Sequence, residues 1–164
     1  MTKLFLVLHV LAAIVAVGPV TVAASMFPKV LRDALAEPGG AAPVTTLRTL
    51  HRICRVYAGV GVAVVGFGFA TASSMDVLGS AWLVTSIALT FVAAVVLIVL
   101  VLPRQESALD AVSGTEPEGD GGAAAVVVDR RTSAQLAMFT GVFNLLWATV
   151  TILMIVRPGS TTGA

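Results

Sequence analysis

"LFLVLHVLAAIVAVGPVTVAAS", residues 4–25, contains no charged side chain and is long enough to cross a bilayer. A transmembrane helix needs about 20 consecutive apolar residues. Three later stretches of the chain, 56–75, 77–103 and 132–156, also lack Asp, Glu, Lys and Arg. The sequence therefore predicts an all-α, polytopic membrane protein, a bundle of four transmembrane helices. We expect the spans at residues 4–27, 53–74, 79–102 and 134–156.

The composition agrees with this fold class. Of the 164 residues, 57% are hydrophobic and only 12% are charged, whereas soluble domains carry roughly 25% charged residues. The net charge of +1 and the lack of a dense basic run argue against a nucleic-acid partner. The lipid bilayer is the partner that the composition predicts.

The first stretch also has the features of a cleavable signal peptide: Lys3, an apolar region, and small residues at 22–24. The distribution of positive charge argues against cleavage, because positively charged loops stay in the cytoplasm. Lys3 and Arg157 lie at one end of a four-helix topology. The other end holds Lys29, Arg32, Arg48, Arg52, Arg55, Arg104, Arg130 and Arg131. We therefore expect an uncleaved first helix, an inner (cytoplasmic) membrane location, and both termini outward.

The loops differ in composition. Residues 29–37 have the pattern of a short surface helix, and Thr45 or Thr46 is a candidate N-cap for the helix that leads into the second span. Residues 104–133 are acidic and rich in glycine, which predicts a flexible cytoplasmic loop. The tail, 157–164, is predicted to be frayed. Lipid phosphates are the expected partners of Arg48, Arg52 and Arg55.

Small residues recur on each predicted span at alternating steps of four and three, which places them on one helix face. In a bilayer, small residues let helix backbones approach closely. We expect these small-residue faces to line the interior of the bundle, with a homodimer contact as the competing use of one of them. The faces are His9, Ala13, Ala16, Val20 and Ala23; Gly59, Ala63, Gly66, Ala70 and Ser73; Ala81, Thr85 and Ala88; and Ala137, Gly141, Asn144, Ala148 and Thr151. Pro19 predicts a kink in the first helix.

The spans contain no charged group of the kind that pumps and ion-coupled transporters carry. The chain also has no metalloprotease, nucleophile-elbow or phosphate-loop motif. We therefore expect a non-enzymatic protein, with an accessory-subunit role in a larger membrane complex as the leading hypothesis. A homo-oligomer is the other assembly that the small-residue faces allow.

His9 is the one histidine inside a predicted span, about five residues from its outer end. Residues at the same depth on the other helices include Thr85, Ser86 and Thr151, so a hydrogen bond to a hydroxyl is the expected arrangement. A haem or metal ligand is the alternative, with haem b as the candidate cofactor. Asn144 is expected to form an interhelical hydrogen bond.

His51 and Cys54 lie at the cytoplasmic entrance of the second span. We expect an interfacial histidine and an inert thiol at these positions.

"LHVLAAIVAVG", with His9 early in the first helix and Gly18 after it, resembles the opening of an uncharacterised bacterial family of four-helix predicted integral membrane proteins. It is distantly similar to the copper-resistance D membrane domain and to the small membrane-embedded bacterial protoporphyrinogen oxidase. The resemblance implies a four-helix membrane fold and a ligand role for His9. The chain departs from these relatives in having Val17 where they tend to carry an aromatic residue, and in lacking a second intramembrane histidine or lysine.

Overall fold

The computed structural model describes residues 2–36, 40–75, 77–114 and 122–159, and in this part of the chain it is entirely helical. Its elements are α1 (Thr2–Ala36), α2 (Ala41–Ser74), α3 (Ala81–Val95), a π-helix η1 (Val96–Val101), α4 (Leu102–Ser113) and α5 (Gly122–Val156). Because α3, η1 and α4 follow one another without a break, they form one rod. Four helices are long and apolar enough to cross a membrane, which confirms the predicted fold class.

The helices are longer than the predicted spans. α1 has 35 residues, which is about 52 Å at 1.5 Å per residue, against a hydrocarbon core of about 30 Å. The expected surface helix at 29–37 is the end of α1. Gly40 is the N-cap of α2, so the expected N-caps Thr45 and Thr46 lie inside the helix and bond the Ala41 and Ala42 carbonyls.

The predicted loop 104–133 is also largely helical, since α4 continues to Ser113 and α5 begins at Gly122. The sequence between Gly114 and Gly122 lies outside the described residues, as do residues 160–164 of the predicted tail. The loop prediction was wrong for 104–113 because α4 keeps packing against α2 after the chain leaves its apolar run: Gln105 and Ala108 are both buried.

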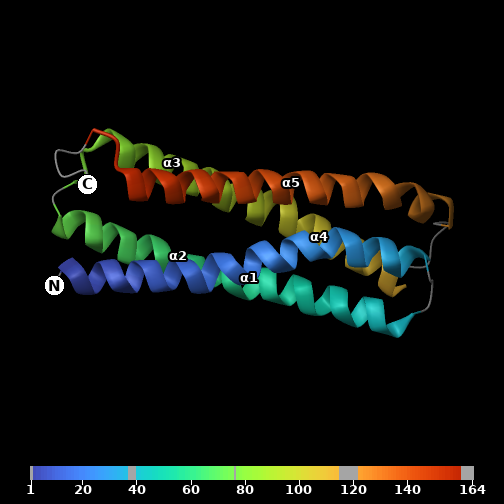
Figure 1. Ribbon diagram of the computed structural model, residues 1–164. Coiled ribbons are helices and arrows are strands. Elements are labelled where there is room, and N and C mark those ends of the chain that lie inside the picture. The colour runs from blue at the N-terminus through green and yellow to red at the C-terminus, as the bar shows by residue number, and fades with distance from the viewer. Residues whose placement is uncertain (1, 37–39, 76, 115–121, 160–164) are drawn as a thin grey trace.

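The helices form two pairs, α1 with α2 and α3 with α5 (Figure 1). α1 also packs on α5, and α4 carries the third rod across to α2. Both ends of the chain lie at the same end of the molecule as the turn after α2 (Figure 1). The segments that connect α1 to α2 and α4 to α5 lie at the opposite end, which we call the arginine-rich end because Arg32, Arg48 and Arg131 lie near it.

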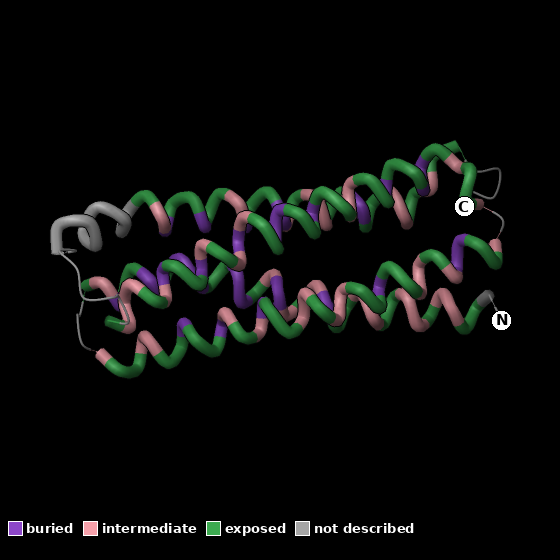
Figure 2. The backbone as a smooth tube through the Cα atoms, turned by 180° about the vertical axis from the view of Figure 1, so that it is seen from behind, coloured by how far each residue is buried: buried purple, intermediate pink, exposed green. Residues whose placement is uncertain are grey.

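The main hydrophobic core lies toward the arginine-rich end. Its fully buried side chains come from all four rods: Phe27, Leu31, Leu47, Cys54, Val101, Gln105 and Leu136. A much smaller cluster, Ala72, Trp82 and Leu83, closes the other end. The purple segments of Figure 2 follow the inward faces of the rods, while the outward faces are green. Large exposed residues such as Val62, Phe91 and Ile155 cover those outward faces, as expected for helices surrounded by lipid.

The small-residue face of α1 points inward as predicted, with Ala16, Val20 and Ala23 buried. The prediction was wrong for the other three helices. Gly59, Ala63 and Gly66 on α2 are exposed, and Ala70 is half-buried. The remaining exposed members are Ser73, Ala81, Thr85, Ala88, Ala137, Gly141, Ala148 and Thr151.

The reason is visible in the glycine pairs of α2. Gly59 and Gly61, and again Gly66 and Gly68, alternate along the helix, so the sequence holds two glycine faces turned about 200° apart at 100° per residue. Gly68 contacts α1, where a Cβ would lie 2.8 Å from Cε1 of His9. A Cβ on Gly59 or Gly66 would meet no atom within 4 Å. The inward face is therefore the one that the histidine occupies.

The π-helix η1 begins three turns into the third rod and ends just before Pro103. The Leu102 N–H donates to the Leu97 carbonyl, five residues back. Proline has no N–H and crowds the preceding turn, so a wider turn relieves it. The Arg104 guanidinium donates to the Leu100 carbonyl at 3.0 Å, and this satisfies an acceptor that the altered turn frees.

Candidate functional site

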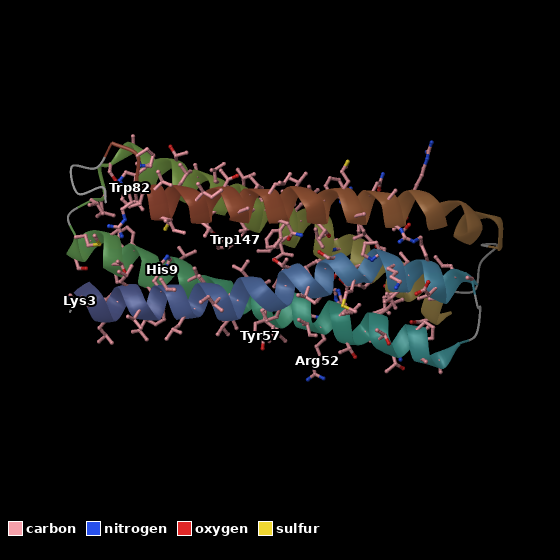
Figure 3. The ribbon with its side chains drawn as sticks, viewed as in Figure 1. Lys3, His9, Arg52, Tyr57, Trp82 and Trp147 are labelled. Atoms are coloured by element: carbon pink, nitrogen blue, oxygen red, sulfur yellow. The ribbon has the colours of Figure 1, made fainter. Side chains whose placement is uncertain are left out.

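His9 bridges the first helix pair. Its Nδ1 lies 2.9 Å from the backbone carbonyl of Val64, and its ring packs against Gly68 (Figure 3). Because a carbonyl can only accept, Nδ1 carries the proton in this bond and Nε2 is left as an acceptor. The absence of a side chain at Gly68 makes room for the ring. The His9–Gly68 contact thus fixes the register of α1 against α2.

The hydroxyls expected around His9 are used within their own helices. Thr85, Ser86 and Thr151 donate to the carbonyls of Ala81, Trp82 and Trp147, each four residues back. The predicted bond from His9 to a hydroxyl was therefore wrong. A short polar side chain in a helix bonds its own backbone readily, and the carbonyl of α2 lies closer to the histidine.

Haem b or a metal ion does not fit the residues around His9. Iron in haem and metal ions generally need further protein ligands or a shaped pocket. No group of three His, Cys, Asp or Glu side chains that could hold a metal occurs among the described residues. His51, the other histidine, lies on the far half of α2, where it bonds Gln105. The ring face of His9 that a macrocycle would need is packed on Gly68.

Asn144 makes the interhelical hydrogen bond that its position predicts. Its Nδ2 donates to the Ser25 hydroxyl of α1 at 3.3 Å, and one turn earlier the Thr140 hydroxyl reaches the Ala24 carbonyl at 3.5 Å. The Asn144 Oδ1 is buried with no hydrogen-bond partner among the described residues. These two polar contacts tie α5 to α1, where the two helix pairs meet.

A buried polar cluster formed by His51, Cys54 and Gln105 is the feature that the sequence did not predict. Gln105 is 0% exposed. Its Oε1 accepts from His51 Nδ1 at 3.3 Å, and its Nε2 donates to the Cys54 Sγ at 3.7 Å. Gln105 stands in a stretch that reads as loop, so no sequence signal pointed to it. The amide joins α4 to α2 and satisfies both polar partners within the core.

Cys54 provides a direct test of this cluster, since it is the only cysteine in the chain and is fully buried. We expect a maleimide to label the folded protein in mild detergent much more slowly than the denatured protein, because only an accessible thiolate reacts. Mass spectrometry at timed intervals measures the rate. Equal labelling rates in the two states would contradict the buried position.

The three arginines predicted to contact headgroups lie on α2 near the arginine-rich end. Arg52 and Arg55 are exposed, and Arg52 points away from the bundle (Figure 3). Arg48 is also exposed and donates to the Ser113 hydroxyl of α4 at 3.4 Å. No arginine among the described residues forms an ion pair with a carboxylate there. Their charge is therefore available to anionic groups outside the chain.

An apolar cavity of about 150 Å³ lies where the two helix pairs separate. All four spans line it: Ala16 and Val20 from α1, Ala58 and Gly61 from α2, Ala94 and Leu97 from the third rod, and Phe143 and Trp147 from α5. Trp147 points from α5 toward the α1–α2 pair (Figure 3). His9 does not line this cavity.

No protein-family model matches the sequence, and neither a curated protein nor a solved structure resembles it at a significant level.

Proposed function

We propose that this chain is a non-enzymatic multi-pass protein of the cytoplasmic membrane that serves as a subunit of a larger membrane assembly. The observation that carries the proposal is the outward direction of the small residues on α2 and α5. Gly59, Ala63 and Gly66 are exposed on α2, and Ala137, Gly141 and Ala148 on α5.

These faces suit a partner helix better than they suit lipid. A Cβ on Gly59, Gly66 or Gly141 would meet no atom within 4 Å, so nothing inside the bundle requires glycine there. In a membrane, leucine gains nothing from contact with another helix rather than with lipid, whereas small residues allow close backbone packing. Glycine also costs about 1 kcal/mol relative to alanine in a helix interior, a cost that a close helix contact can offset.

The proposal places the arginine-rich end in the cytoplasm and both termini outside. Eight of the ten Lys and Arg residues lie toward the arginine-rich end, and positive charge is retained on the cytoplasmic side. The resemblance of the His9 and Gly18 region to the uncharacterised four-helix family is compatible with this role. It remains part of the proposal.

The test compares two double variants in native membranes. Replacing Gly59 and Gly66 with Leu should abolish cross-linking to a partner and its co-purification in mild detergent, because bulky side chains keep helices apart. Replacing Val62 and Val65 with Leu is the matched control, since both positions are exposed on α2 and carry no small residue. A wild-type chain that remains a solitary monomer in native membranes would refute the subunit role.

A cross-linked species of twice the chain mass would identify a second copy as the partner. A different added mass would identify another membrane protein. An unchanged cross-link in the Gly59 and Gly66 variant would exclude the α2 face as the contact.

A further inference from the structure

The cavity between the helix pairs opens sideways toward the bilayer. Its rim includes Val62, Val65 and Ile98, all of which are exposed. α2 and the third rod come together only below it, where Gln105 meets His51 and Cys54. The cavity is therefore a groove in the side of the bundle, closed at the bottom by the core.

Water is a poor occupant of this groove. A buried water needs two to four polar partners, and nearly all of the lining is apolar. The Thr90 hydroxyl lines the groove but donates to the Ser86 carbonyl at 2.8 Å. Leaving the space empty would forfeit the dispersion contacts of the side chains around it.

We infer that the groove binds one acyl chain of an anionic phospholipid from the leaflet at the arginine-rich end. Hydrocarbon is the chemistry that matches the lining, and the bilayer supplies it at this depth. The inference is independent of the proposed partner contact, because the groove lies between α2 and the third rod rather than on the Gly59–Gly66 face.

The position of Arg55 supports a phospholipid with its phosphate at the arginine-rich end. Arg55 lies one turn before Ala58, which lines the groove, and it is exposed. One turn of helix rises about 5.4 Å, so a phosphate at Arg55 places the start of an acyl chain at the lower edge of the groove. Arg52 adds a second exposed positive charge on the same helix. An anionic headgroup is favoured by both charges.

Trp147 reports directly on the occupant. The chain has two tryptophans, so Trp82→Phe leaves Trp147 as the only one. In phosphatidylglycerol vesicles whose acyl chains carry bromine at mid-chain, we expect strong quenching of Trp147. Ala94→Phe in the same background should fill the groove and at least halve the quenching. Val99→Phe is the control, because Val99 is exposed on the same rod and does not line the groove.

Retained lipid gives the second measurement. Native mass spectrometry of the protein released from phosphatidylglycerol membranes in mild detergent should show one bound phospholipid, lost in Ala94→Phe and kept in Val99→Phe. Arg55→Gln should weaken retention about fivefold, as expected for one lost positive charge near an anionic headgroup. If Ala94→Phe fails to fold by circular dichroism, Gly61→Leu replaces it, since a Cβ there meets no atom within 4 Å.

Equal quenching in Ala94→Phe and Val99→Phe would overturn the inference, as would the absence of a retained phospholipid in the wild-type protein. Retention that is the same in phosphatidylcholine and phosphatidylglycerol would overturn the role of Arg55 and leave a site for the acyl chain alone.

Discussion

Phe27→Ala is expected to lower the free energy of unfolding by about 3–5 kcal/mol, the range for removing a fully buried phenylalanine. Phe27 is 0% exposed and lies in the main core, among side chains of all four rods. Its removal leaves a cavity that the long helices, each held along its whole length, close only in part. Titration with a denaturing detergent, followed by circular dichroism, measures the change.

Phe91→Ala is the matched control. Phe91 is 70% exposed on α3, so in the membrane its ring contacts lipid in both the folded and the separated helices. We expect a change well below that of Phe27→Ala. Similar losses for the two variants would mean that the core is not concentrated toward the arginine-rich end.

Gly68→Ala is expected to destabilise the α1–α2 pair by about 1–3 kcal/mol, the usual cost of overpacking. The added Cβ would lie 2.8 Å from Cε1 and 3.0 Å from Nδ1 of His9, so the ring must move and its bond to the Val64 carbonyl is strained. Gly66→Ala, two residues away with no atom within 4 Å of the new Cβ, should be neutral or slightly stabilising.

A double-mutant cycle separates the clash from other effects of Gly68. His9→Ala alone should cost about 0.6 kcal/mol, the average for an interhelical hydrogen bond in a membrane protein. In the His9→Ala background, Gly68→Ala should cost much less than it does in the wild-type protein. Additive costs would show that the two residues do not touch.

The four spans could be predicted from the sequence because their cause is local. A stretch such as 4–25 has no charge and the length of a bilayer, and no tertiary contact is needed to see either property. Helix ends were harder to predict. α4 runs on to Ser113 because Gln105 and Ala108 are buried against other helices, and that stabilisation is invisible in a stretch whose composition is polar.

The inward faces could not be predicted from spacing alone. α2 offers two glycine faces of the same period, one through Gly59 and Gly66 and one through Gly61 and Gly68. A repeat of small residues shows that a helix can be approached closely, but not whether its neighbour belongs to the same chain. His9 resolves the choice, since its ring fits only where Gly68 faces α1. Its partner is a backbone carbonyl, and no sequence pattern marks one carbonyl among many.

The π-helix has a consequence for how this chain tolerates changes in length. A wide turn at 96–101 behaves as one residue inserted into an otherwise regular helix. Deleting one residue there would restore regular winding but rotate everything after it by about 100°. Gln105 would then turn away from His51 and Cys54, and a hydrophobic neighbour would replace the amide between them. The third rod is therefore out of phase with itself by design of its sequence, and its two halves are correct only as a pair.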